Sequence, residues 1–336
     1  MNNMLRYEGE FVELGKTGLK VSRLAFGCGF RGIYEIDEAA RTIEQAIDSG
    51  INFIDCANMY KLRSGEHAEI ALGKAIKGKR DKLVITSKYG GEGGGASASN
   101  VAKQIDESLK RIGTDHIDVY FLHMPDPKVS YEEIVTSLDR IQASGKIRAY
   151  GFCNHKAWQV VRMYDFAREN GLNPVSVVQN SYNLLNRSAE DELLPACRYD
   201  GLGVMTYSPI AAGLLSGVFA HGGKAPEKST WHYEEVYQEY LKKVFPGRIE
   251  KIVNLVADMA EKYGVTSPAV AVAWLMRNHD VSSVIAGADN MQEFEAYVQG
   301  ASLSLTDDDW NELESQSFRM AELFTRPDVK KLVNRI

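Results

Sequence analysis

Four residues that could move protons stand at or near the ends of apolar segments. Asp55 ends the segment INFID, and Tyr60 follows it five residues later. Lys88 comes directly after LVITS, and His123 ends DVYFLH. A phenol exchanges protons poorly at neutral pH unless a neighbouring cation stabilises the phenolate. A lysine could supply that cation, an aspartate could hold the lysine, and an imidazole could donate a hydrogen bond to an oxyanion. Such a set would suit the reduction of a carbonyl group.

Each of these residues also has a purely structural interpretation. Asp55 could be a helix N-cap, the commonest use of an aspartate after a strand. Lys88 could be a solvated loop residue, and His123 could be a satisfied polar residue near the core. The functional interpretation therefore depends on whether the fold brings the four side chains together.

Short apolar runs rich in β-branched residues alternate with segments of helical periodicity. Near-continuous apolar character is typical of parallel strands that are covered on both faces. The strand candidates are LAFG (24–27), INFID (51–55), LVITS (83–87), DVYFLH (118–123), IRAYGFC (147–153), VSVVQ (175–179), GVMTYS (203–208) and SSVIAG (282–287). Helical spacing, with serine caps or terminal glycines, is found in 37–50, 97–113, 130–146 and 157–171. The alternation predicts an α/β fold, the eight-stranded (β/α)8 TIM barrel.

The length of 336 residues fits one barrel with insertions. We therefore predict a single domain over residues 1–336. Its expected parts are a β-hairpin over about 10–23, the barrel over about 24–300, extra helices after the seventh and eighth strands, and a C-terminal helix and tail over about 305–336. A doubly wound sheet is the alternative, but FGCGFRG (26–32) has the wrong spacing for the GxGxxG fingerprint.

The predicted barrel would gather the candidate residues at one place. The C-terminal ends of barrel strands meet at an open rim, where reactive groups lie. Asp55, Lys88 and His123 stand at the ends of the second, third and fourth predicted strands, and Tyr60 follows in the loop after the second. This placement favours the catalytic interpretation over the structural ones.

Composition argues against several other classes of protein. The formal net charge of −6 gives no attraction for nucleic acid or an anionic membrane surface. No apolar run approaches the roughly 20 residues of a membrane span, and the N-terminus lacks the features of a signal peptide. The four cysteines are far apart and form no metal-binding pattern, so we expect no metal and reduced thiols. The chain is expected to be cytoplasmic.

The residues at the rim resemble those of the aldo-keto reductase family. The family's pattern of Asp, Tyr five residues later, then Lys and His is matched in NFIDCANMYKLRSGEHAEIALGKAI, LVITSKYG and IDVYFLHMPD, and the similarity runs from VELGKTGLKVSRLAFG to LSLTDDDW (303–310). The resemblance implies a catalytic tetrad of Asp55, Tyr60, Lys88 and His123. It also implies a hairpin that closes the bottom of the barrel, and a nicotinamide cofactor held without a Rossmann motif.

A set of cofactor-binding residues is implied by the same resemblance. Asn154 and Gln179 would bind the nicotinamide carboxamide, and Tyr207 would stack on the ring. Small residues of the next loop would fold over the pyrophosphate, with Arg248 as a further phosphate contact. The complete set is Gly27, Cys28, Asp55, Cys153, Asn154, Gln179, Tyr207, Ser208, Pro209, Ile210, Ala211, Gly213, Gly217, Arg248, Gly287, Asp289 and Glu293.

The sequence departs from the family's pattern at the adenosine end of this set. The family usually uses NADP(H), but Asp289 stands in the place of a serine and Asn290 where a basic residue is common. A carboxylate would repel a 2′-phosphate and accept hydrogen bonds from free ribose hydroxyls. NADP(H) is therefore implied by the resemblance, and NAD(H) by these two replacements. A register shift of one residue, which would put Gln292 on the adenine, would weaken this inference.

Two functions are compatible with the resemblance. The first is an NAD(P)H-dependent oxidoreductase that reduces an aldehyde, ketone or sugar carbonyl, or oxidises the alcohol, with Tyr60 as general acid or base. The alternative is a non-catalytic, nucleotide-sensing regulatory subunit on the same fold, a branch known for departing at the histidine position. The presence of His123 favours the enzyme. Cys28-Gly29 stands where the family often has Thr-Trp or Thr-Met, which should widen the floor of the substrate pocket.

Overall fold

A computed structural model describes residues 5–91, 95–227 and 229–317. The described chain forms two compact units. The first lies within Met1–Asn180, Glu192–Tyr207 and His279–Glu295, and the second within Ser181–Asp191, Ser208–Asn278 and Ala296–Ile336. The single domain expected from the sequence stays a prediction.

The first unit is built on a closed barrel of parallel strands. Its strands follow one another in chain order around the barrel, and the last pairs with the first. They are β3 (Leu24–Gly27), β4 (Phe53–Asp55), β5 (Val84–Tyr89), β6 (Ile117–Leu122), β7 (Ile147–Cys153), β8 (Val177–Ser181), β9 (Gly203–Tyr207) and β10 (Ser283–Gly287). The TIM-barrel prediction is confirmed, and each strand end lies within two residues of its predicted position.

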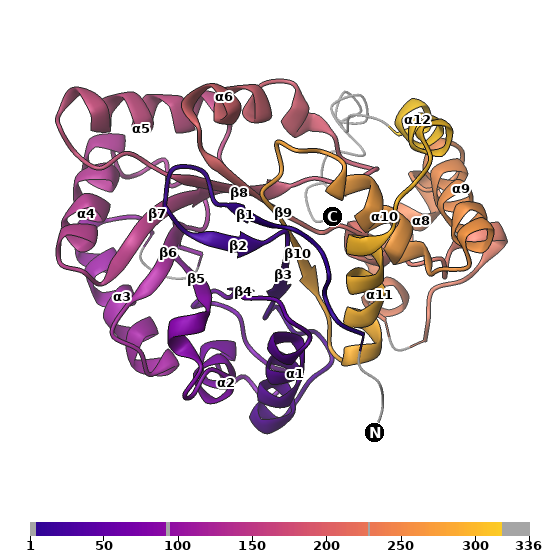
Figure 1. Ribbon diagram of the computed structural model, residues 1–336, viewed down its shortest axis with the longest axis horizontal. Coiled ribbons are helices and arrows are strands. Elements are labelled where there is room, and N and C mark those ends of the chain that lie inside the picture. Colours follow the sequence, from indigo (N-terminus) through magenta and orange to yellow (C-terminus); the bar gives the residue numbers. More distant parts are fainter. Residues whose placement is uncertain (1–4, 92–94, 228, 318–336) are drawn as a thin grey trace. The chain divides into compact units, whose positions relative to one another are not determined.

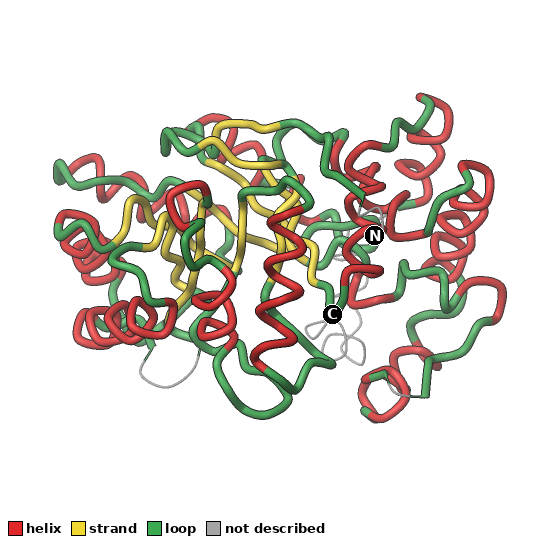
Figure 2. Tube along the Cα trace, turned by 60° about the horizontal axis from the view of Figure 1, so that its bottom comes forward, coloured by secondary structure: helices red, strands yellow, loops and turns green. Residues whose placement is uncertain are grey.

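Helices of the first unit lie along the outside of the strands, which form the inner layer (Figures 1 and 2). They are α1 (Ile36–Asp48), α2 (Ala68–Ala75), α3 (Ala98–Ile112), α4 (Tyr131–Ala143), α5 (Ala157–Glu169) and α6 (Leu193–Asp200), with a 3-10 turn at Arg80–Lys82. The caps agree with the sequence signals. Ser97 Oγ accepts a hydrogen bond from the Asn100 N–H, and Gly113 ends α3 in the left-handed conformation with φ 73°.

An antiparallel hairpin closes the N-terminal end of the barrel. It consists of β1 (Phe11–Glu13) and β2 (Lys20–Ser22). Leu14, Leu19 and Val21 pack into the same buried cluster as the inward-facing side chains of the barrel strands. Gly15 lies against the start of β9, so close that an added Cβ would be 2.2 Å from the Gly203 nitrogen. The opposite end, where the strands terminate, is the end that carries the candidate catalytic residues.

The second unit is mainly helical. It holds α7 (Thr230–Tyr233), α8 (Glu235–Lys243), α9 (Arg248–Tyr263), α10 (Ser267–Met276) and α12 (Asp307–Gln316), with 3-10 turns at Ser188–Glu190, Ala211–Gly213 and Ala220–Gly222. Helix α11 (Met291–Ser302) begins in the first unit and continues into the second. Helices α7 to α11 are the extra helices predicted after the seventh and eighth barrel strands, and α12 is the predicted C-terminal helix. The predicted C-terminal tail lies outside the described residues beyond residue 317.

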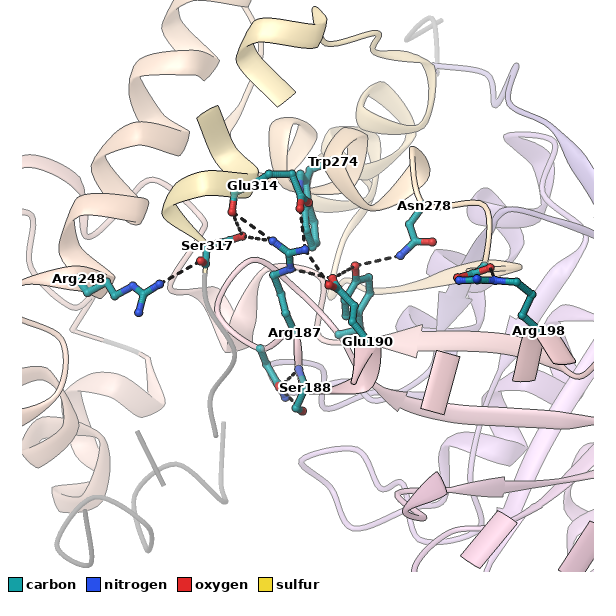
Figure 3. A network of polar contacts seen from close by, with 12 residues as sticks. Arg187, Ser188, Glu190, Arg198, Arg248, Trp274, Asn278, Glu314 and Ser317 are labelled. Atoms are coloured by element: carbon teal, nitrogen blue, oxygen red, sulfur yellow. Dashed lines mark hydrogen bonds and ion pairs between the residues drawn. The ribbon is translucent and has the colours of Figure 1, made fainter. Parts of the chain in front are cut away.

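A polar network within the second unit centres on Arg187 (Figure 3). Its guanidinium lies 2.7 Å from a Glu190 carboxylate oxygen and 2.6 Å from one of Glu314. It also donates to Ser317 Oγ at 2.7 Å. Arg187 therefore joins the segment before α6 to the end of α12. Within the described ranges, no helix has both the length and the apolar character needed to cross a membrane.

Candidate active site

The structure brings Asp55, Tyr60, Lys88 and His123 together at the C-terminal end of the barrel. Lys88 Nζ lies 2.7 Å from Asp55 Oδ2 and 3.4 Å from the Tyr60 hydroxyl. The rings of Tyr60 and His123 meet edge to face, with centroids 5.8 Å apart. The Tyr60 phenol thus lies beside an ammonium and an imidazole, and the Asp55 carboxylate holds the ammonium.

Strand geometry explains why these side chains converge. Asp55 is the last residue of β4, Lys88 lies in β5, and His123 follows directly after β6. Asp55 pairs with Thr86 across the β4–β5 ladder, so Lys88, two residues further on, faces the same way just beyond it. Lys88 is wholly buried, and the solvated-loop interpretation is therefore wrong. The N-cap interpretation of Asp55 is also wrong, because the residue capping the next helix, α2, is His67.

Three side chains hold the Asp55 carboxylate. Oδ2 accepts the bond from Lys88, while Oδ1 accepts one from the Thr86 hydroxyl at 2.6 Å and one from Gln179 Nε2 at 2.8 Å. Lys88 Nζ donates a further bond to the Cys56 carbonyl at 2.9 Å. The buried ion pair is therefore saturated with hydrogen bonds, which compensates part of the cost of taking both charges out of water.

Burial and charge act in opposite directions on the proton-transfer groups. Burial by itself would lower the pKa of Lys88, but the adjacent Asp55 carboxylate raises it well above its ordinary value, so Lys88 is an ammonium at neutral pH. Burial raises the pKa of Tyr60 to about 12, although the charge on Lys88 pulls that pKa downward. The cation thus acts in the direction expected from the sequence, and burial outweighs it. Tyr60 holds its proton at neutral pH, as a general acid must.

His123 is neutral under the same conditions. Burial and the charge on Lys88 lower its pKa to about 4. Its Nδ1 atom is buried and has no hydrogen-bond partner among the described residues. A neutral imidazole beside the phenol can donate one hydrogen bond to a substrate oxygen without adding a positive charge.

The residues expected to bind the nicotinamide carboxamide stand next to the tetrad. Asn154 has φ 62°, a left-handed conformation that asparagine tolerates better than most residues. Its amide donates to the His123 carbonyl at 3.0 Å, and its Oδ1 accepts from the Tyr207 hydroxyl at 2.6 Å. The Cys153 thiol lies 3.7 Å from Gln179 Oε1. Two side-chain amides and a partly exposed tyrosine ring beside the phenol are chemically suited to a nicotinamide.

The loop expected to cover the pyrophosphate belongs to the second unit, and so does Arg248. The loop residues are Ser208, Pro209, Ile210, Ala211, Gly213 and Gly217. Four of them have positive φ, namely Ser208 (57°), Ala211 (49°), Gly213 (98°) and Gly217 (89°). Gly217 lies so close to Ser267 that an added Cβ would be 2.7 Å from its Oγ. Arg248 is the first residue of α9, as expected, and donates to the Ser317 carbonyl at 3.3 Å (Figure 3).

The carboxylates expected at the adenosine end bind backbone of the first unit. Asp289 follows β10, whose last residue is Gly287, and it accepts hydrogen bonds from the N–H groups of Arg31 at 2.9 Å and Gly32 at 2.7 Å. Glu293 accepts from the Asp289 N–H at 2.9 Å and from the Asn290 side chain at 3.0 Å. Asp289 thus ties the loop after β3 to the loop after β10, a structural task that its place in the sequence did not reveal.

Two residues at or behind the site were not identified from the sequence. Thr86 holds Asp55 from the inner side of β5. Side chains two residues apart on a strand face the same side, so the position of Lys88 could have indicated that Thr86 also faces the inside of the barrel. Glu69 of α2 lies behind the same strand, fully buried. It accepts a hydrogen bond from Ser87 Oγ at 2.6 Å and lies 2.5 Å from Arg111 Nε. Its buried position follows only from the packing of α2 and α3.

Comparison with known proteins adds an independent observation. The model of the Aldo/keto reductase family matches residues 24–317. The chain is 31% identical over 316 residues to "Uncharacterized oxidoreductase YrpG" of Bacillus subtilis (strain 168). That alignment covers 88% of this chain and 92% of the relative. The matched range contains every strand of the barrel and all four residues of the tetrad.

Proposed function

The chain belongs to the aldo/keto reductase family, and from that premise we propose that it reduces aldehydes, ketones or sugar carbonyls, or oxidises the corresponding alcohols, with a nicotinamide cofactor. The observation that carries the proposal is the contact of the Lys88 ammonium with the Tyr60 phenol, at 3.4 Å, while Asp55 holds the same ammonium. This is an arrangement that can release a phenolic proton to an oxygen that is gaining negative charge.

The proposed reaction consists of the transfer of a hydride and the transfer of a proton. A bound nicotinamide would supply the hydride that reduces the carbonyl carbon. Tyr60 gives its proton to the carbonyl oxygen, and Lys88 stabilises the phenolate that remains. His123 donates a hydrogen bond to the same oxygen, and Asp55 keeps Lys88 in place. In the alcohol-oxidising direction Tyr60 is the base and must first lose its proton.

The side chains proposed to hold the cofactor are those that meet beside the tetrad. Asn154 and Gln179 offer amide donors and acceptors to the carboxamide, and Tyr207 offers a ring face. Close to them, Gly29 lies beside the phenol, where an added Cβ would be 3.8 Å from the Tyr60 ring, in ordinary van der Waals contact. The lack of a bulky side chain at this position supports a substrate pocket with a wider floor. The four cysteines are free and buried, which supports the proposal of a reducing, cytoplasmic location.

We expect NADH to bind more tightly than NADPH. Asp289 and Glu293 place two carboxylates where the family's adenosine contacts are expected, and a dianionic 2′-phosphate beside them meets repulsion that a free ribose hydroxyl does not. Titration of both cofactors by quenching of the protein's fluorescence measures the difference. Addition of a generic aldehyde to each saturated sample then shows whether the bound cofactor is oxidised, which tests the proposed activity itself.

Replacing Asp289 with asparagine removes its charge together with one of the two oxygens that accept hydrogen bonds from the Arg31 and Gly32 N–H groups. Asp289→Asn should improve NADPH binding relative to NADH by roughly fivefold or more, because one carboxylate charge is removed. Asp308→Asn, on the exposed face of α12, makes the same change of net charge elsewhere and should leave the ratio unchanged. Equal or tighter binding of NADPH by the unmodified chain would overturn the preference for NADH.

A further inference from the structure

We propose that Thr86 is a positioning residue for the proton transfer, because its hydroxyl fixes the carboxylate of Asp55 and so sets how the Asp55–Lys88 pair acts on Tyr60. The inference rests on the proposed function. It starts from one contact: Thr86 Oγ1 donates to Asp55 Oδ1 at 2.6 Å, a short hydrogen bond to a charged acceptor. Both residues are buried, with Thr86 at 0% and Asp55 at 2% exposure.

The two carboxylate oxygens of Asp55 have separate tasks. Oδ2 faces Lys88 at 2.7 Å, and Oδ1 faces away from it, toward Thr86 and Gln179. A carboxylate with one anchored oxygen cannot rotate about its own axis without breaking that bond. The donors on Oδ1 therefore hold Oδ2 against the ammonium and share part of the negative charge.

The barrel itself shows that a buried threonine hydroxyl need not have such a partner. Thr206 in β9 is 1% exposed, and its hydroxyl has no hydrogen-bond partner among the described residues. Packing alone therefore does not require the Thr86 hydroxyl to reach a carboxylate. Gln179 also holds Oδ1, but it stands among the residues proposed to bind the cofactor, so changing it would disturb two functions at once.

Loss of the Thr86 hydroxyl has a definite electrostatic consequence. The titratable side chains that face Tyr60 are Lys88 from β5, Asp55 from β4, His123 after β6, Cys153 from β7 and Tyr207 from β9. Lys88 favours the phenolate, and Asp55 disfavours it. Without the hydroxyl, the Asp55 carboxylate has one hydrogen-bond donor fewer to share its negative charge, and the electrostatic potential at the phenol becomes more negative. Ionisation of Tyr60 then becomes harder.

The test compares variants that differ by the hydroxyl. In the alcohol-oxidising direction, kcat rises with pH as Tyr60 loses its proton. Thr86→Val should move this rise to higher pH by about half to one unit, and lower kcat at a fixed pH below it by roughly three- to tenfold. Thr86→Ser keeps the hydroxyl and should restore the profile. Thr86→Ala differs from Thr86→Ser by that oxygen alone and should behave like Thr86→Val, so the comparison stands even if valine does not fold.

Thr206→Val is the matched control, since it removes a buried barrel hydroxyl without a partner and should leave the pH profile unchanged. A second readout does not depend on turnover. Ring-labelled tyrosine NMR of the protein without cofactor follows the Tyr60 phenol directly, and the same upward shift is expected in Thr86→Val and Thr86→Ala. Identical profiles for Thr86→Ala and Thr86→Ser by both methods would overturn the proposal. A phenol shift without any turnover in the unmodified protein would uphold it and refute the proposed function instead.

Discussion

Replacing Tyr60 with phenylalanine abolishes turnover while leaving cofactor binding almost intact. The variant keeps the ring that contacts His123 and loses only the hydroxyl beside Lys88, which is the proposed proton donor. Positioned acids contribute about 10²- to 10⁴-fold to a rate, so kcat should fall to roughly one hundredth or less. Steady-state kinetics with a generic aldehyde and a cofactor titration measure the two properties separately. Retention of more than a few per cent of kcat would remove Tyr60 from the mechanism.

Tyr89→Phe supplies a matched control for that variant. Tyr89 is fully buried one residue after Lys88, and its hydroxyl has no hydrogen-bond partner among the described residues. Loss of this oxygen should leave kcat within about twofold of the unmodified protein.

The pKa of about 12 for Tyr60 also predicts the direction of the pH dependence in each reaction direction. Reduction needs the protonated phenol and should decline only as pH rises toward that value, whereas oxidation needs the phenolate and should rise over the same range.

Replacing Glu69 with alanine is expected to cause the largest loss of stability. Its carboxylate is wholly buried, 2.5 Å from Arg111 Nε, and it accepts a bond from Ser87 on the strand that carries Lys88. Removal of one partner from a buried ion pair costs about 3–5 kcal/mol, and the lower end of that range is expected here because Glu107 remains 3.8 Å from the Arg111 guanidinium, which is 17% exposed. Equilibrium unfolding in urea, read by circular dichroism, measures the loss. The Glu69→Ala substitution should also weaken the packing that supports β5 behind Lys88.

The contrast with an exposed ion pair makes that expectation specific. Asp37 lies 2.7 Å from Lys74, at 71% and 53% side-chain exposure. Asp37→Ala should therefore cost far less stability than Glu69→Ala, because solvent screens the exposed pair. Comparable losses in the two variants would show that the Glu69–Arg111 pair contributes no more than a surface contact.

The barrel could be predicted from the sequence because its strands are short apolar runs that need no partner to be recognised. The chain order of those runs, together with the shared polarity of parallel strands, then placed Asp55, Lys88 and His123 at one rim. Strand ends were less certain. Lys88 was expected just after its strand, whereas β5 continues to Tyr89, because alternation of inward and outward side chains does not stop at the last apolar residue.

Hydrogen-bond partners outside the tetrad were the part that the sequence could not supply. Asp289 was expected to face a ribose, but its carboxylate binds the backbone of Arg31 and Gly32. That contact joins loops more than 250 residues apart, and backbone N–H groups leave no signal in the residue types. Thr86 was missed because threonine is common in strands rich in β-branched residues. Only the pairing of Thr86 with Asp55 across the β4–β5 ladder shows that its hydroxyl can bind the carboxylate.

The measurement that tests the central claim most directly follows the hydride itself. The purified chain is incubated with an aldehyde and reduced cofactor in which both hydrogens at nicotinamide C4 are deuterium, and the product alcohol is analysed by mass spectrometry. One deuterium on the former carbonyl carbon is expected, with formation of the labelled alcohol lost in Tyr60→Phe and kept in Tyr89→Phe. Binding of the cofactor without any labelled alcohol from a panel of aldehydes and ketones would contradict the claim that this barrel is a carbonyl reductase.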